Sequence, residues 1–405
     1  DKGVILARLG RKEEALEQLE AYLSVAPDAS DTQRILSLVE ELKNGSDKTE
    51  HYMADSISTG PDYDAALWGA TAGLHLERRA LAVTGKSPGD MLNGILSNSP
   101  PPPLHGEEGG LVRGIVRYST LLTHKGKMVS DMRWLTAPAG GYFLDLPHAG
   151  FDGALAHFNK FLPPRLAKVE DVTSQVAFLT LLGPEGPSIL AEVWPKAGFP
   201  GSPEKMVELK EGEELVFPWS GKGALRISGE GDTHVDGWNL MVPAGSADRL
   251  WKALDSAGAI PLTERTMNVL RLEKGRPVFG VDMDQDTIVL EAGIQGRAID
   301  EAKGCYAGQE VVIRIRDRGH VNKELRGLLL GDLPIPPAGS ELFPAGGEKS
   351  VGRITSAVPS PAFRQNIALG YLRRAVGPGD RVRVGAADGP EAEVRALTDG
   401  GWVLD

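Results

Sequence analysis

The chain has 405 residues, of which 41% are hydrophobic and 24% are charged, a composition typical of a globular protein with about two to three domains. Its single cysteine excludes an internal disulfide bond and a self-contained four-thiolate metal site. A net charge of -11 disfavours non-specific binding to nucleic acid, which needs clustered Lys and Arg. The sequence has no apolar run long enough to predict a membrane span, and its first residues lack the layout of a signal peptide. We therefore expect a cytoplasmic protein that contacts neither nucleic acid nor membrane.

The N-terminal segment is predicted to be helical. Apolar residues recur every three or four positions over residues 4–23, and a second helix is expected over 31–43. The pattern LGRKEEALEQLEAYLSVAPD resembles the end of a tetratricopeptide repeat. One such repeat cannot bury its own apolar face. Residues 1–43 are therefore interpreted either as a docking segment for a protein partner or as the tail of another helical module.

The central part of the chain alternates between strand-like and helix-like segments. Residues 44–62 are polar and rich in turn formers, which predicts a linker. The mixed order of elements with short loops over residues 63–324 favours an α+β fold. Strands are expected at 74–85, 116–124, 128–137, 141–147, 177–183 and 224–229, helices at 87–98, 151–162 and 247–258, and a loop running into a helix at 183–193.

The C-terminal part, residues 325–405, has a different pattern. Short β-prone runs recur there at regular spacing with turn residues between them, which predicts a small closed β-domain. Its strands are expected at 325–332, 351–360, 366–374, 380–386 and 392–398.

The segment KGCYAGQE at residues 303–310 contains the only cysteine, Cys305. The thiolate is the reactive form of cysteine, and Lys303 would favour that form if its ammonium lies close to the sulfur, as would the arginines that follow. The segment after it is predicted as a strand, on which Arg314, Arg316 and Arg318 share one face; one interpretation is that this face could bind a polyglutamate tail, a phosphate or RNA. The alternatives are that Cys305 is a small buried hydrophobic residue and that the arginines form a solvated face.

These residues carry a family resemblance. KGCYAGQE, followed by the G-x-V-N-K turn at 319–323, resembles the hallmark of the YgfZ family, folate-binding relatives of the glycine-cleavage T protein, an aminomethyltransferase. Further similar segments are LAVTGKSPGDMLNGILSN, LLTHKGKMVSDMRWL, TERTMNVLRLEKGRPVFGVDM and VGRITSAVPSP. The resemblance covers about residues 64–405. It implies two ferredoxin-like α+β modules and a C-terminal β-barrel, arranged as a ring around a channel that holds tetrahydrofolate.

The resemblance also implies which residues contact the folate. Asp131 lies where the T protein has Asp-Asp-Leu, beside the reacting nitrogens of the folate. Glu230 matches the first half of the strand with which the T protein contacts the pterin edge. Asn239 stands near the position where that strand of the T protein has its last carboxylate. Arg271 lies on a segment that lines the channel in relatives, where a guanidinium suits a bidentate bond to the glutamyl tail. An ion pair on a strand is the alternative for Arg271.

Tyr306, Gln309 and Arg314 complete the predicted folate contacts, and Cys305, Lys303 and Asp131 are the predicted functional residues. No resident metal is expected, because the eight histidines show no metal-binding spacing. Cys305 alone can only share the ligation of a metal or cluster with another molecule.

The resemblance to YgfZ implies a tetrahydrofolate-binding accessory protein that supports assembly or repair of iron–sulfur clusters in client enzymes, and through them tRNA modification. Its expected partners are the folate and iron–sulfur client or assembly proteins. The first alternative is a folate-dependent aminomethyltransferase or demethylase of the T-protein type, which the single Asp131 and the neutral Asn239 disfavour. The second is an interaction protein recruited through residues 1–43.

Overall fold

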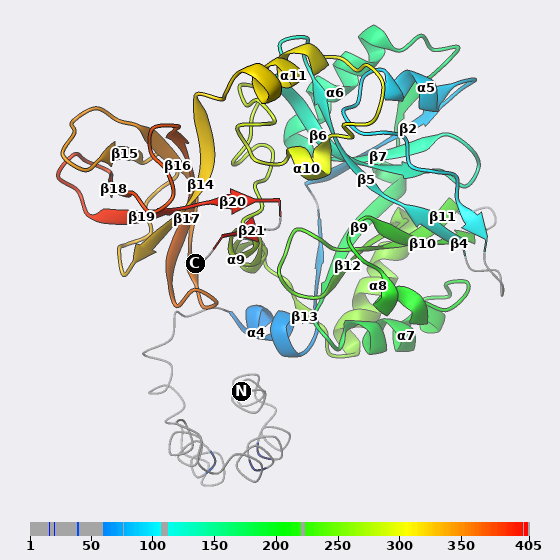
Figure 1. Ribbon diagram of the computed structural model, residues 1–405. Coiled ribbons are helices and arrows are strands. Elements are labelled where there is room, and N and C mark those ends of the chain that lie inside the picture. The colour runs from blue at the N-terminus through cyan, green and yellow to red at the C-terminus, as the bar shows by residue number, and fades with distance from the viewer. Residues whose placement is uncertain are drawn as a thin grey trace.

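The computed structural model describes residues 60–75, 77–106, 112–219, 223–399 and 401–403, together with the single residues 16, 20 and 39. The predictions for the segment at 1–43 and for most of the linker at 44–62 fall outside these residues. Over the part of the chain that the structure describes, no helix is long and apolar enough to cross a membrane. The described chain forms two β-sheets with covering helices, followed by a β-barrel (Figure 1).

The larger sheet has eight strands in the order β13-β1-β9-β12-β11-β10-β4-β3. Their bounds are β1 (Thr71–Leu74), β3 (His105–Gly106), β4 (Val112–Ile115), β9 (Val176–Leu182), β10 (Glu213–Trp219), β11 (Gly223–Gly229), β12 (Gly237–Pro243) and β13 (Ile260–Pro261). Helices α7 (Gly186–Lys196) and α8 (Ala244–Ser256) pack against each other and share a buried core with this sheet. The core includes Leu190 and Trp194 from α7 and Leu250 from α8.

The smaller sheet has five strands in the order β5-β6-β7-β2-β8. They are β2 (Arg78–Thr84), β5 (Arg117–Leu122), β6 (Met128–Thr136), β7 (Tyr142–Pro147) and β8 (Lys168–Asp171). Helix α6 (His148–Phe161) contacts β6, β7, β2 and β8, so it covers one face of the sheet. Phe158 of α6 packs there with Leu81 and Trp134, and all three are fully buried.

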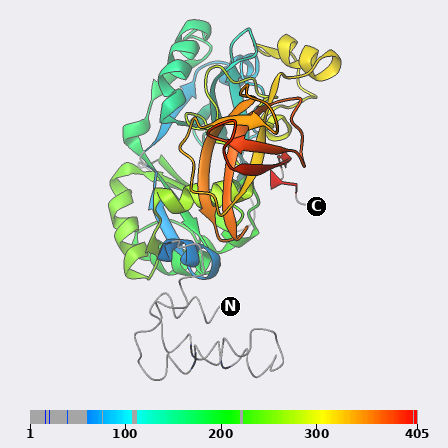
Figure 2. The ribbon, with the colours of Figure 1, turned by 90° about the vertical axis from the view of Figure 1, so that its left-hand side faces the viewer.

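The chain passes between the two sheets several times. β1 belongs to the larger sheet and β2 to the smaller, β3 and β4 return to the larger sheet, β5 to β8 build the smaller one, and β9 to β13 complete the larger. Seen from the side, the two sheets with their helices lie one above the other, behind the barrel (Figure 2). Each sheet is therefore assembled from segments that are distant in sequence.

The barrel is closed, with the strand order β14-β17-β16-β15-β18-β19. Its strands are β14 (Lys323–Gly331), β15 (Glu341–Pro344), β16 (Gly352–Ser360), β17 (Gln365–Arg373), β18 (Arg381–Val384) and β19 (Glu391–Arg395), and β20 (Leu397–Thr398) pairs with β21 (Gly401–Trp402) after it. The predicted α+β fold followed by a closed β-domain is confirmed. The remaining described helices are α4 (Pro61–Trp68), α5 (Pro88–Asn93), α10 (Gln295–Ala298) and the 3-10 helices η2 (Thr173–Gln175) and η3 (Glu204–Glu208).

Two segments that we interpreted as strands are helices. The segment with Arg271 is α9 (Glu264–Lys274), where Thr263 accepts a hydrogen bond from the amide of Thr266 and Gly275 ends the helix at φ 76°. A hydroxyl at the N-cap and a left-handed glycine after the last turn are the usual ends of a helix. α9 contacts α4 on one side and barrel strands β16 and β17 on the other.

The second is the arginine-rich segment after Cys305, which forms α11 (Gln309–Arg318). Gly308, at φ 83°, turns the chain into the helix through a backbone conformation that favours glycine. Glu310 lies in the first turn and Arg316 and Arg318 in the last, so these charges oppose the helix dipole and favour a helix over the strand-like alternation. As a consequence, Arg314, Arg316 and Arg318 do not share one face as they would on a strand.

Candidate functional site

A cavity of about 540 Å³ lies between the two sheets. The smaller sheet contributes Tyr118 and Arg133, and the larger sheet contributes Ser228 and Gly229. Its charged lining residues are Arg117, Arg133, Arg276, Arg297, Glu211, Asp232 and Asp399. With four guanidinium groups against three carboxylates, this central cavity is suited to a ligand that carries negative charge.

A buried carboxyl group, Asp131 on β6, lines a side cavity of about 50 Å³ that shares Tyr118, Arg133 and Arg297 with the central cavity. Tyr118 Oη donates to Asp131 Oδ2 at 2.7 Å, and the guanidinium of Arg297 lies 4.1 Å from the centre of the Tyr118 ring. Asp131 Oδ1 is buried and has no hydrogen-bond partner. Burial raises the pKa of Asp131, while Tyr118 and nearby arginines act in the opposite direction. The structure therefore holds a carboxyl group with one oxygen free to accept a hydrogen bond.

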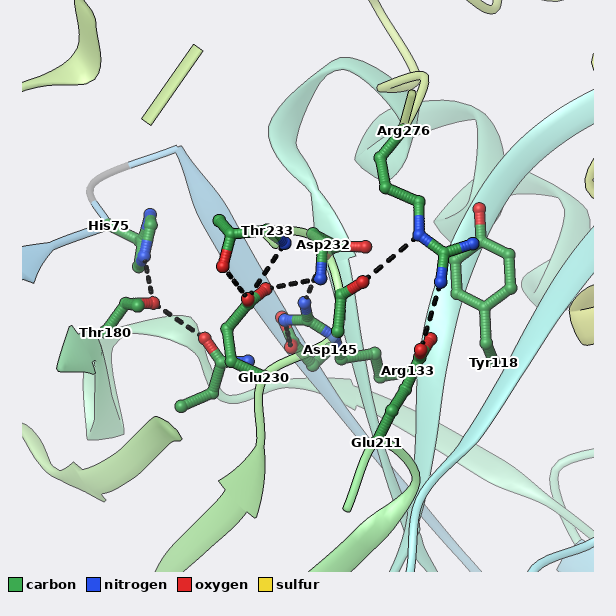
Figure 3. Close-up of polar contacts among 12 residues, drawn as sticks. His75, Tyr118, Arg133, Asp145, Thr180, Glu211, Glu230, Asp232, Thr233 and Arg276 are labelled. Carbon is green, nitrogen blue, oxygen red and sulfur yellow. Dashed lines mark hydrogen bonds and ion pairs between the residues drawn. The ribbon is translucent and has the colours of Figure 1, made fainter. Parts of the chain in front are cut away.

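Asp232, in the loop after β11, pairs with Arg133 (Figure 3) and with Arg297. Its carboxylate lies 2.7 Å from Arg133 Nη2 and 3.1 Å from Arg297 Nη1. Burial alone would raise the pKa of Asp232, but Arg133 and Arg297 outweigh burial and hold that pKa well below its usual range. Asp232 is therefore a permanent anion that fixes both guanidinium groups.

Arg276, which follows α9, fixes the opposite wall of the cavity (Figure 3). Its Nε donates to Gly231 O at 3.1 Å and its Nη2 lies 3.0 Å from Glu211 Oε2, while Nη1 donates to Asp399 O at 2.5 Å. Segments next to β10 and β11 of the larger sheet and the segment after the barrel thus meet at one guanidinium.

A chain of neutral polar groups lies at a narrow branch of about 30 Å³ lined by His75 and Asn239. Thr180 Oγ1 donates to Asn239 Oδ1 at 2.6 Å, so it accepts from His75 Nε2–H at 2.5 Å (Figure 3). Burial, with Arg78 and Arg133, lowers the pKa of His75 to about 4. The imidazole is therefore neutral near pH 7, and its proton is on Nε2.

Two of the residues predicted to bind folate form contacts within the protein. Glu230 accepts hydrogen bonds from the amides of Asp232 and Thr233 at 2.6 and 3.0 Å, so it shapes the loop that presents Asp232. Arg271 is buried, donates to Asp282 Oδ2 at 2.7 Å and to Ser356 Oγ at 3.1 Å, and does not line the central cavity. The ion-pair alternative for Arg271 is thus present, although on a helix and not on a strand.

The residues predicted around Cys305 are spread over the outside of the cavity wall. Cys305 and Arg314 are exposed, and Tyr306 is buried in an apolar cluster with Val312. Gln309 is the first residue of α11. The Nζ atom of Lys303 donates to three backbone carbonyl oxygens, which use all the protons of an ammonium group. None of these five residues lines the cavity.

Several cavity residues were absent from the sequence-based prediction, namely Tyr118 as a partner of Asp131, Arg133, Asp232, Arg276 and Arg297. Gly229 and Gly231, which flank Glu230, offered a signal, because paired glycines often allow a close approach of backbone and ligand. Within the described ranges, no group of three or more His, Cys, Asp and Glu side chains is arranged to hold a metal ion.

Two family models match the described chain, one over most of the two sheets and one over the barrel. Residues 81–303 match the GCVT N-terminal domain, and residues 323–398 match the glycine cleavage T-protein C-terminal barrel domain.

Individual relatives cover much of the chain. An aminomethyltransferase of Thermosynechococcus vestitus is 30% identical over 260 residues, which span 64% of this chain and 67% of that protein. An aminomethyltransferase of Corynebacterium jeikeium is 27% identical over 297 residues, 69% of this chain and 74% of the relative. The crystal structure of the glycine cleavage system aminomethyltransferase T from Bartonella henselae has the same fold, with a TM-score of 0.69, 22% identity, and coverage of 85% of this chain and 90% of that one.

Proposed function

Since this chain belongs to the glycine-cleavage T-protein family, we propose that it binds tetrahydrofolate in the central cavity and acts in the transfer of a one-carbon unit of the aminomethyl type. The curated relatives that support this proposal are named aminomethyltransferases. Asp131 is the residue of this chain that we assign to the reaction.

The unpartnered oxygen of Asp131 carries the proposal. A buried polar atom without a partner costs about 1–3 kcal/mol, so a ligand that donates a hydrogen bond to Oδ1 would recover that free energy. The amine and amide N–H groups of a pterin are donors of this kind. A volume of about 540 Å³ also lies within the usual range for the pocket of a small-molecule ligand.

The remaining lining residues divide into two roles. Asp232 pairs with Arg133 and Arg297, so these groups maintain the shape of the cavity. Arg117 is exposed where it lines the cavity, and its guanidinium suits the carboxylates of a glutamyl tail.

Tetrahydrofolate, when bound, supplies the nitrogens that accept the one-carbon unit. The protein contributes a proton acceptor, because burial raises the pKa of Asp131 and a carboxyl group with a raised pKa exchanges a proton more readily near neutral pH. Tyr118 restricts this exchange to Oδ1, since its hydroxyl occupies Oδ2.

A second candidate function is the accessory role in iron–sulfur cluster assembly or repair that the YgfZ hallmark implies. Two observations favour it: Cys305 is exposed, and Asn239 is neutral and already bonded to Thr180. Both candidates use the same folate cavity and share the expected cytoplasmic location. They differ in whether aminomethyl turnover occurs and whether the Cys305 thiol is needed.

Titration of tetrahydrofolate against tryptophan fluorescence tests the shared part of the proposal. Asp131→Asn should weaken binding by about tenfold or more, because the amide lacks the charge that accepts the ligand donor. Asp152→Asn, at an exposed position on α6, is the matched control and should bind as the wild type does. Equal affinity of the two variants for tetrahydrofolate, or no binding by the wild type at millimolar ligand, would overturn the proposed folate site.

Ammonia release from an aminomethyl donor separates the two candidates. We expect tetrahydrofolate-dependent release by the wild type and by Cys305→Ser, and its loss in Asp131→Asn. No release, together with a requirement for Cys305 in the activity of an iron–sulfur client enzyme, would favour the accessory role instead.

A further inference from the structure

Lys303 occupies an unusual position for a charged side chain. Its Nζ donates to the carbonyl oxygens of Asn93, Leu96 and Asn98 at 2.8, 2.5 and 3.1 Å. These carbonyls belong to the last residue of α5 and the turn after it, where carbonyl groups lack helical partners and carry partial negative charge. Burial lowers the pKa of Lys303 to about 8, so the ammonium form that makes all three bonds predominates near neutral pH.

The loop that Lys303 holds, residues 94–98, is bonded on its other side to the wall of the central cavity. Asn98 is 8% exposed, and its Nδ2 donates to Tyr118 O at 2.9 Å and to Arg297 O at 3.1 Å. Ser97 adds a bond from its Oγ to Ala298 O at 2.7 Å. The loop thus joins β5 to α10, two elements that contact each other.

Tyr118 and Arg297 are the residues on which the site depends. Tyr118 fixes Asp131, while Arg297 covers the Tyr118 ring and pairs with Asp232. We propose that Lys303 is a positioning residue of the central cavity: its ammonium holds the 94–98 loop, and through Asn98 the loop sets Tyr118 and Arg297 for the ligand. This inference rests on the proposed folate site, and it replaces the predicted effect of Lys303 on Cys305 with an action on the cavity.

A double-mutant cycle on tetrahydrofolate affinity tests this connection. Lys303→Met and Asn98→Ala should each weaken binding by about tenfold. The double variant should show about the same tenfold loss, because both substitutions break the same connection. Arg117→Met alters the cavity by an independent route. When Lys303→Met is combined with Arg117→Met, the loss of affinity should therefore be the product of the two single losses. Additive effects of Lys303→Met and Asn98→Ala, or unchanged affinity in Lys303→Met, would overturn the proposal.

Two controls keep the outcome interpretable. Lys252→Met, at an exposed position on α8, should bind as the wild type does. If Lys303→Met does not fold, Lys303→Arg retains a cation with N–H donors and should give a smaller loss, about threefold, and its combination with Asn98→Ala should lose no more than the tenfold of Asn98→Ala alone.

A measurement without ligand separates failure of this inference from failure of the folate proposal. Amide hydrogen exchange in Lys303→Met should accelerate at residues 94–98 and also in β5 and α10, while the barrel strands stay unchanged. Acceleration restricted to residues 94–98 would show that Lys303 only stabilises its own loop, whether or not the protein binds folate.

Discussion

Two networks of arginine and carboxylate groups lie close together in this protein and differ in how completely their carboxylate oxygens are hydrogen-bonded. In the clamp of α9 to the barrel, formed by Arg271, Asp282, Thr355 and Ser356, each oxygen of Asp282 accepts two hydrogen bonds. At the central cavity and the side cavity next to it, by contrast, Arg297 Nε and Asp131 Oδ1 are buried without a hydrogen-bond partner. The residue types are the same, so composition does not distinguish a structural network from a receptive one. The difference lies in the two carboxyl groups: Asp282 is fully paired within the protein, whereas Asp131 has one buried oxygen without a partner.

The largest expected effect breaks the clamp. Asp282→Ala leaves Arg271 buried without its counter-ion, and removing one partner of such a pair typically costs about 3–5 kcal/mol. Urea denaturation of the variant and wild type measures this free energy of unfolding. Tetrahydrofolate affinity, measured where the variant is folded, should stay within about threefold of the wild type. A stable variant with strongly weakened binding would show that the clamp belongs to the site.

An intermediate effect contrasts two carboxyl groups of the cavity. The pKa of Asp232 is depressed by Arg133 and Arg297 despite burial, so its stabilisation is present near neutral pH, begins to fall near its usual pKa and is lost fully only below the depressed pKa. The pKa of Asp131 is raised by burial, so its charged form destabilises the fold at pH values above that raised pKa. Asp232→Asn should therefore lower the free energy of unfolding by about 2 kcal/mol at about pH 7, and Asp131→Asn should raise it by about 1 kcal/mol.

Both differences from the wild type should shrink toward about pH 3, because Asp131 is protonated there and part of the stabilisation by Asp232 is lost as the unfolded chain binds protons. Thermal unfolding at several pH values is the measurement. Destabilisation by Asp131→Asn at neutral pH would mean that its charge is compensated within the free protein.

The smallest expected effect concerns Arg314. The sequence placed it among the folate contacts, but it is exposed on α11 and does not line the cavity. Arg314→Met should leave tetrahydrofolate affinity within about twofold, whereas Arg117→Met should weaken it more. A loss of fivefold or more in Arg314→Met would place the ligand tail over α11 and extend the receptive region beyond the cavity.

Much of the fold could be predicted from the sequence because its strands have local signatures. The runs around Asp131 and in the barrel alternate in polarity or are strongly β-prone between turn residues, and β6 and β17 lie close to their expected positions. The strand predictions for the segments of Arg271 and Arg314 were wrong because their short alternating pattern also fits a helix. The helix caps and the tertiary contacts decided between strand and helix.

The cavity was harder to predict for a geometric reason. Asp131 was proposed from family resemblance, and the structure adds that its Oδ1 is buried without a hydrogen-bond partner. Arg133, Asp232 and Arg297 lie on separate elements, and only the folded chain brings the two arginines to 2.7 and 3.1 Å from Asp232. Lys303 was predicted as a functional residue beside Cys305, and its contacts with three backbone carbonyls could not be foreseen because they leave no pattern in a sequence.

The interleaved path of the chain has a consequence for how the protein is made. β1 pairs with β13, and the lining residues Arg297 and Asp399 follow both, so the cavity has no complete wall until the segment after the barrel has left the ribosome. Such long-range pairing slows folding, because the chain between the partners must be closed first. The barrel, by contrast, is one contiguous stretch. A ligand that binds only the finished cavity stabilises the fully folded protein and no earlier folding intermediate. The abundance of that ligand would therefore influence how much of the newly made protein survives.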